Sequence, residues 1–196
     1  PALLQLLEQL PTTAGDYQHA LAVPVQWVEK LADDAARPGA GNGQRVLWGR
    51  VATGQLTPCQ SIVVVPGGQT ATVVQVLDHT RQPGSVSAGQ SAGVVLDRAV
   101  DVSRGDWLLA HGDTDTPFET RQDVVGTVAW LDDAPLQPGR SYWAVHGHRW
   151  VKARVTRITH ELDVHTLQRR DATELGSNAI GDIVLALQSP IVVLPY

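Results

Sequence analysis

The chain contains no methionine, one cysteine (Cys59) and one phenylalanine among its 196 residues. A single cysteine excludes an internal disulfide and fits a reducing compartment, so we expect a cytoplasmic location. The sequence has no apolar run of 18 residues, which excludes a membrane-spanning helix. Its first ten residues lack the basic start and small-residue cleavage site of a secretion signal. Because the chain opens on Pro1 and has no start methionine, we expect it to be a piece of a longer polypeptide.

The charge balance and the missing nucleotide motifs argue against two further functions, nucleic-acid binding and nucleotide binding. Lysine and arginine number 15 and aspartate and glutamate 20, so the formal net charge is −5. An acidic chain without a basic block is a poor candidate for non-specific nucleic-acid binding. Neither GxxxxGK[ST] nor a helix-opening GxGxxG occurs, so these residues are not expected to hold nucleotide phosphates. We therefore predict no bound cofactor within this chain.

Hydrophobic periodicity predicts one short helix followed by an all-β chain. Leucines recur at helical spacing over residues 2–10, and Pro11 ends the run. From about residue 20, short runs of Val, Ile, Leu, Thr and Trp are separated by Gly, Pro, Asp and Asn, which is typical of strands. Strands are predicted over 21–29, 45–53, 60–66, 69–78, 91–97, 106–110, 121–131, 140–147, 149–159, 179–188 and 191–194.

The frequent turn signals favour two consecutive small antiparallel β-barrels, because closure removes exposed sheet edges. A polar stretch over 111–120 separates them and is followed by a fresh strand. The sequence therefore predicts a connector over 1–19, a first barrel over 20–114 and a second barrel over 115–196. Each barrel is small but large enough for a core.

Two segments of the first half carry family patterns. In RVLWGRVATGQL (45–56), Gly49 interrupts a strand where a backbone approaches closely, and Gly54 ends it. In AGQSAGVVLDRAVDVSRGDWLL (88–109), Arg-Gly-Asp at 104–106 is interpreted as a structural turn and not as a cell-adhesion motif. In order and spacing, these segments resemble the β-barrel second domain of translational GTPases of the elongation factor Tu class.

The second half resembles a narrower family. It contains W-L-x-x-x-P-L-x-P-G-R-x-Y, V-x-A-x-V-x-x-I, D-V-x-T-L, L-x-x-N-x-I-G and P-x-x-x-x-P-Y in that order. These pieces resemble the large, GTP-hydrolysing subunit of bacterial sulfate adenylyltransferase (ATP sulfurylase), including its fusions with adenylylsulfate kinase. The family-motif positions, expected to be structural, are Arg45, Gly49, Gly54, Gly89, Asp101, Arg104, Gly105, Asp106, Pro138, Gly139, Asp163, Leu167, Asn178 and Gly181.

The resemblance implies a role in sulfate assimilation. In that family, GTP hydrolysis is coupled to the formation of adenosine 5′-phosphosulfate from ATP and sulfate, and a separate small subunit transfers the adenylyl group. It implies that GTP and Mg²⁺ bind in a GTPase domain outside this chain. The two barrels are then expected to relay its conformational change, to dock the small subunit, and to be inactive alone. The first half by itself leaves an alternative open: barrels of a translation-type GTPase that bind charged tRNA.

Three features depart from the family pattern. An Ala- and Gly-rich stretch over 31–44 replaces a short link, and it is predicted to form a long loop. Trp48 stands where a small residue is expected. Cys59 stands where the barrel turn usually has glycine.

A candidate partner surface follows from the tryptophans and basic residues. Most of the six tryptophans are expected to fill barrel interiors, but Trp48 and Trp150 have basic neighbours and are candidates for an interface. Alternation puts Lys152 and Arg154 on one strand face, which is either a solvated face or a docking surface for an acidic partner or for the parent's GTPase domain. The candidate surface comprises Trp48, Arg50, Arg149, Trp150, Lys152 and Arg154.

No catalytic or metal-binding residue is predicted. His146-Gly147-His148 is interpreted as a hairpin tip, since two histidines without a third ligand make a weak zinc site. His160, Asp163 and His165 alternate as on the polar face of a strand. Cys59 has no histidine partner and is not expected to act as a nucleophile. The carboxylate pairs fall in predicted turns, where aspartate is favoured for local hydrogen bonds; they are Asp33-Asp34, Asp113/Asp115 and Asp132-Asp133.

Overall fold

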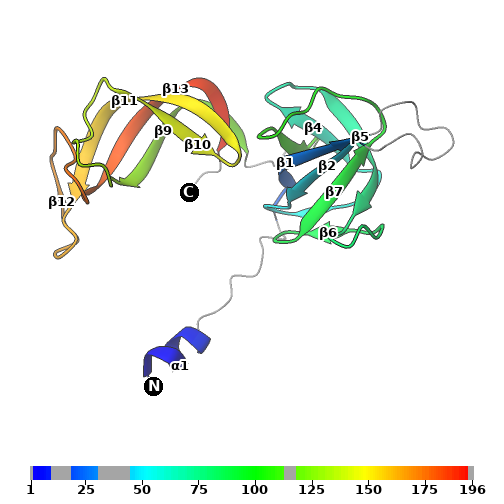
Figure 1. The fold of residues 1–196 in the computed structure, drawn as a ribbon, viewed down its shortest axis with the longest axis horizontal. Helices are drawn as coiled ribbons and strands as arrows, with labels where there is room; N and C mark the ends of the chain where they lie inside the picture. The colour runs from blue at the N-terminus through cyan, green and yellow to red at the C-terminus, as the bar shows by residue number, and fades with distance from the viewer. Residues whose placement is uncertain (1, 10–18, 31–44, 113–117, 194–196) are drawn as a thin grey trace. The chain divides into compact units, whose positions relative to one another are not determined.

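The computed structural model describes residues 2–9, 19–30, 45–112 and 118–193, and it is dominated by antiparallel β-structure (Figure 1). Within these ranges one helix, α1 (Ala2–Gln9), precedes thirteen strands. The predicted all-β fold is confirmed. Contacts divide the chain into two compact units, each described by itself below. No helix in the described ranges combines the length and apolar character needed to cross a membrane.

The first unit is a closed antiparallel barrel. It comprises Pro1–Val63, Gln69–Asp101 and Leu108–Thr116. The barrel strands, in order around the barrel, are β1 (Ala22–Lys30), β2 (Arg45–Arg50), β7 (Ser91–Leu96), β5 (Thr70–Leu77), β4 (Ser61–Val65) and β8 (Trp107–Ala110). A separate two-stranded sheet pairs β3 (Gln55–Leu56) with β6 (Val86–Ser87).

Alternating Val and Ile residues build the interior of this barrel. In β4, Ile62 and Val64 are fully buried while Ser61 is exposed. In β5, the same alternation buries Ala71 and Val73, and the register shift between Val73 and Gln75 then turns Val76 inward. β-branched side chains suit such a pleated, half-buried surface, so local propensity and packing select the same structure.

The second unit is built on a five-stranded antiparallel sheet. It comprises Val64–Gly68, Val102–Trp107 and Pro117–Tyr196. In order across the sheet, the strands are β10 (Ser141–His146), β11 (Arg149–Leu162), β13 (Ile180–Val193) and β9 (Glu119–Ala129), and β12 (Arg169–Arg170) pairs with the far end of β11. β9, β11 and β13 lie side by side in Figure 1.

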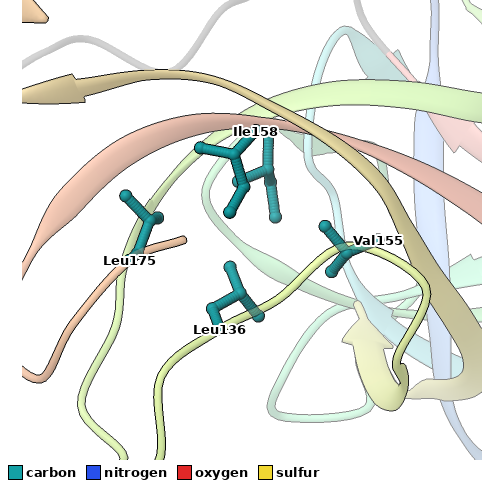
Figure 2. Close-up of a cluster of buried hydrophobic side chains, with 5 residues drawn as sticks. Leu136, Val155, Ile158 and Leu175 are labelled. Atoms are coloured by element: carbon teal, nitrogen blue, oxygen red, sulfur yellow. The ribbon is translucent and has the colours of Figure 1, made fainter. Parts of the chain in front are cut away.

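A cluster of aliphatic side chains forms the core under one end of this sheet. Leu136 and Leu175, from two turns joined by mutual backbone hydrogen bonds, point toward Val155 and Ile158 of β11 (Figure 2). Ile183 of β13 completes the cluster, and all five residues are at most 7% exposed. A second cluster of Val151, Ala153 and Leu187 lies further along β11 and β13.

The strands match the sequence prediction closely, and the differences have physical causes. β13 is one strand where two were predicted, because a register shift between Ala186 and Ile191 absorbs Ser189 and Pro190 as a bulge. The prediction missed β3, β6 and β12, each of which has two residues and therefore no measurable alternation. The second unit's described strands form an open sheet order, whereas the first unit is closed.

Two other predictions need correction. No tryptophan in the chain is fully buried, although Trp130 packs against the core of the second unit as a partly buried side chain. Aliphatic residues fill most of the interiors, and three tryptophans are more than 60% exposed: Trp27, Trp143 and Trp150. The strand-like alternation read over His160, Asp163 and His165 is wrong beyond position 162, because β11 ends at Leu162 and Asp163 opens a turn.

The predicted domain boundary stays a prediction, because residues 113–117 lie outside the described ranges. So do the loop predicted over 31–44 and the carboxylate pairs Asp33-Asp34 and Asp113/Asp115.

Candidate functional site

Six family-motif positions have backbone angles that glycine or asparagine tolerate best. Gly54, Gly89, Gly105 and Gly139 have φ between +72° and +95°. Leu167 and Asn178 are left-handed as well, with φ of 57° and 62°. Such conformations cost most side chains about 1–2 kcal/mol. The motif residues at these positions therefore shape turns.

Two further motif glycines are required by close approach. A Cβ on Gly49 would lie 2.2 Å from the carbonyl oxygen of Pro24, and one on Gly181 would lie 2.6 Å from that of His160. Contacts under 3.0 Å are not tolerated, so any side chain would separate these strands.

The polar motif residues mostly bond to nearby backbone. The Arg45 guanidinium donates to the Val100 carbonyl, and the Asp101 N–H donates to the side chain of Gln69. In the Arg-Gly-Asp segment, the Asp106 carboxylate accepts the Ser103 N–H at 2.8 Å, and the Asp106 N–H donates back to the Ser103 carbonyl. Arg104 of this turn is exposed. These contacts favour the structural interpretation of that turn.

Pro138 and Asp163 stand in turns as well. Pro138 precedes Gly139, whose N–H donates to the Val155 carbonyl at 2.7 Å. Asp163 Oδ1 accepts the N–H groups of Thr166 and His165 at 3.0 and 2.9 Å. These backbone donors hold the pKa of the Asp163 carboxyl below its ordinary value.

Asp163 and Asn178 also border an open hollow of about 320 Å³. Its charged side chains are already paired with one another. Arg170 lies 2.9 Å from Glu161 and 3.8 Å from Asp163. The bond to Glu161 raises the pKa of Arg170. The hollow therefore offers no free charge to a ligand.

In the first unit, Trp48 is held by its neighbours. Its indole N–H donates to Glu29 Oε2 at 2.8 Å, and the Arg81 guanidinium lies 5.2 Å from its ring centroid. Arg81 also pairs with Glu29 at 3.1 Å. Both contacts lower the pKa of the Glu29 carboxyl, and the hydrogen bond from the Trp48 indole is the larger cause. The opposite strand carries Gly93, where a Cβ would lie 2.9 Å from the Trp48 ring, so this glycine makes room for the unexpected tryptophan.

Two other candidate surface residues are tied to structure. Arg50 of β2 donates to the Gly89 carbonyl at 2.9 Å. Arg149, at the start of β11, is half-buried and lies 3.5 Å from Asp106. Asp106 belongs to the short segment Val102–Trp107 of the second unit. Both arginines are therefore already bound to other parts of the chain.

The remaining three candidates are Trp150, Lys152 and Arg154, and they share one exposed face of β11. Alternation predicted the shared face for Lys152 and Arg154. Val151 and Ala153 between them are buried. The hairpin partner β10 adds Trp143 and Val145 to the same face, because Val145 pairs with Trp150 and Trp143 with Lys152. We call these five residues the β10–β11 face: Trp143, Val145, Trp150, Lys152 and Arg154.

Trp143 and Val145 were not predicted as surface residues from the sequence, although a signal for them was present. β10 ends at His146 and β11 begins at Arg149, so His146-Gly147-His148 is a hairpin tip, as predicted, with φ of 59° at Gly147. A two-residue turn fixes the register. Trp143 must then face the same side as Lys152, and a lysine belongs in solvent.

Among the other chemistry-bearing residues, His146 and Asp132 have local partners. His146 stacks on Trp107 with ring centroids 5.5 Å apart, and its burial lowers the pKa of the imidazole. Asp132 accepts the Ala134 N–H at 3.0 Å in a turn, as predicted for that carboxylate pair. Cys59 is exposed. In the described ranges, no three His, Cys, Asp or Glu side chains are grouped so that they could hold a metal ion.

Comparison with known proteins identifies relatives over the whole chain. Residues 123–196 match the model of the GTP-eEF1A C-terminal domain-like family. The chain is 36% identical over 196 residues to the bifunctional enzyme CysN/CysC of Xylella fastidiosa, covering 100% of this chain and 30% of that protein. It is 30% identical to sulfate adenylyltransferase subunit 1 of Laribacter hongkongensis, covering 100% of this chain and 38% of that protein. The chain thus spans about a third of the length of these relatives.

Solved structures share the fold at low identity. The crystal structure of sup35 complexed with GDP matches with a TM-score of 0.75 and 19% identity, over 97% of this chain and 44% of that one. Translation elongation factor SelB from Methanococcus maripaludis matches with a TM-score of 0.66 and 14% identity, over 98% of this chain and 41% of that one. Both likenesses concern the fold alone.

Proposed function

We propose that this chain, which belongs to the family of sulfate adenylyltransferase subunit 1 and its bifunctional relatives, is the non-catalytic β-module of a GTP-hydrolysing sulfate adenylyltransferase subunit. In this proposal the module docks the small, adenylyl-transferring subunit. It also relays the conformational change of a GTPase domain during the formation of adenosine 5′-phosphosulfate from ATP and sulfate. GTP and Mg²⁺ would be bound by that GTPase domain, and the location would be the cytoplasm.

One observation carries the proposal: similarity to these subunits extends over the whole chain. The sequence motifs that resemble the family include Gly49, Gly54, Gly139 and Gly181, and each of these glycines meets a backbone constraint of this fold. Such constraints preserve rigid β-units. Rigid units suit a relay, because they pass on a rotation without deforming.

The docking part of the proposal is supported by the β10–β11 face. Its tryptophans are exposed and belong to the residue types enriched in interface hot spots. The described charged residues elsewhere are largely paired in turns or with each other, as at Arg170 and Glu161.

Titration calorimetry of this chain against the sulfate adenylyltransferase small subunit from the same source tests the proposal. We expect saturable one-to-one binding. Absence of binding, by a chain whose circular dichroism shows the β-fold, would contradict a docking role.

A second candidate function is binding of charged tRNA, since translation factors share this fold. Aromatic and basic residues also gather on one face, which is a feature of nucleic-acid surfaces. Filter binding with aminoacyl-tRNA separates the two candidates. Tight binding that weakens steeply with salt would favour the tRNA function over the sulfurylase function.

A further inference from the structure

We infer that the β10–β11 face is the part of the second unit that contacts the small subunit, and that it takes an acidic segment carrying an exposed apolar side chain. This inference rests on the proposed function. It goes further by naming the surface and the chemistry of the segment that fits it.

The apolar half of the contact is an open hollow between two tryptophans. Trp143 and Trp150 meet edge to face, with ring centroids 6.5 Å apart and planes at 82°. They line a hollow of about 330 Å³. The rings are 61% and 65% exposed, and neighbouring Val145 is 53% exposed. Three large apolar side chains gathered on one hairpin mark an interaction site more strongly than scattered ones.

The charged half of the contact is a set of cations without acidic partners. Lys152 Nζ lies 5.4 Å from the Trp143 ring centroid, and Arg154 is the next exposed residue along β11. A bulge between Val155 and Arg157 turns Arg157 outward as well. Within the described ranges, none of these three cations forms an ion pair.

The sheet register shows how far this positive strip extends. Arg154 pairs with Ala186 of β13, and Ala186 pairs with Asp123 of β9. Asp123 is thus two strands away from Arg154, roughly 10 Å between backbones. Asp182 of β13 lies on the same face near Arg157, but it is already 3.7 Å from Arg169. Lys152 and Arg154 are therefore the cations of the strip that lie farthest from acidic side chains.

Charge complementarity selects the occupant. The whole chain has a net charge of −5, so an acidic segment is attracted only where unpaired cations gather locally, as they do in this strip. An acidic segment is thereby directed to Lys152 and Arg154. Its apolar side chain then enters the hollow between the tryptophans, where desolvation holds it.

The test measures binding of the small subunit to the whole chain by calorimetry, with one double tryptophan variant and one matched control. The double variant Trp143→Thr/Trp150→Thr keeps strand-forming residues at exposed positions. We expect it to weaken the Kd at least about 30-fold. The control, Trp27→Thr, removes a tryptophan that is 62% exposed on β1 of the first unit. We expect the control to bind like the unchanged chain.

A second pair of changes keeps the test decisive if the tryptophan variant does not fold. Lys152→Glu and Arg154→Glu alter exposed side chains without an ion pair to lose. We expect each to weaken binding about tenfold, with the larger part of the change in the association rate.

The outcomes separate this inference from the proposed function. If the small subunit binds the unchanged chain and all four variants alike, the docking function stands and the β10–β11 face is wrong. If it does not bind the unchanged chain at all, both fail. If charged tRNA binds instead, and the same variants abolish that binding, the face is a nucleic-acid surface and the inference is overturned.

Discussion

Cys59 is a single residue whose backbone angle is unfavourable for its type. Its φ is 65°, in the left-handed region that favours glycine, and the sequence resemblance also pointed to glycine at this turn. The side chain is exposed, so nothing in the packing offsets the strain. The sequence resemblance pointed to this position, but only the backbone angle explains why glycine belongs there.

Cys59→Gly is therefore expected to stabilise the first unit. Relief of the left-handed strain gains about 1–2 kcal/mol, and the greater freedom of glycine in the unfolded chain takes back about 0.5–1 kcal/mol. Urea unfolding should show a net gain of roughly 0.5–1 kcal/mol. Cys59→Ala is the matched control, since it removes the thiol and keeps the strain. Equal stability of the two variants would contradict this explanation.

Glu29 provides a prediction about protonation. Its carboxylate accepts the Trp48 indole N–H at 2.8 Å, and this bond is the first cause of its lowered pKa. Trp48→Phe removes the donor and keeps a ring under Arg81. The pKa of Glu29 should then rise toward its ordinary value of 4.5, as followed by NMR of the carboxyl carbon. An unchanged pKa would mean that Arg81 alone sets it.

The same shift has a consequence for stability. Because the folded-state pKa of Glu29 is lowered, its contribution is present above pH 4.5 and is lost as the pH falls through the folded value. The unchanged chain should be more stable than Glu29→Gln at neutral pH, and the difference should shrink in acid. A difference that is the same at pH 7 and pH 3 would refute this assignment.

At the scale of elements, the sequence was most informative where alternation was long. The Val-rich runs of β4 and β5 predicted their spans to within a residue. The exposed faces were harder to predict, because any hydrophobicity pattern assigns a tryptophan to the core. At Trp143, exposure follows from pairing with Lys152, which depends on the hairpin register and not on the residue itself.

Two glycines on neighbouring strands of the second unit test the close-approach argument. A Cβ at Gly181 of β13 would lie 2.6 Å from the His160 carbonyl, whereas one at Gly126 of β9 would meet nothing within 4 Å. Gly181→Ala should therefore destabilise the chain by about 2 kcal/mol or more. Gly126→Ala should stabilise it by roughly 0.5 kcal/mol. Equal effects in thermal unfolding would show that the strands can separate at no cost.

At the scale of the whole molecule, the motif order and the similarity over the whole chain point to the same family. The fold explains most motif positions as turns and close contacts. The candidate partner surface could be placed only in part. Alternation put Lys152 and Arg154 on one face, and basic neighbours pointed to Trp150. Trp48, Arg50 and Arg149 make contacts within the chain that their sequence neighbours did not reveal.

The overall charge gives a prediction about association. Because an acidic chain would approach its partner through a positive strip, salt should screen the attraction and slow the association. Raising the ionic strength from about 0.05 M to about 0.5 M should weaken the Kd for the small subunit at least about threefold. The variant Lys152→Gln/Arg154→Gln should lose most of this dependence. If the salt dependence persists in that variant, the electrostatic attraction does not come from Lys152 and Arg154, and this explanation is wrong.

The most direct measurement of the central claim is a nitrogen–proton NMR spectrum of the six tryptophan indoles, recorded with and without the small subunit. Each indole N–H gives one resonance, assigned by single substitution. We predict that the Trp143 and Trp150 resonances shift or broaden while that of Trp27 stays in place. Perturbation of Trp27 alone, or no change at saturating small subunit, would contradict docking through the β10–β11 face.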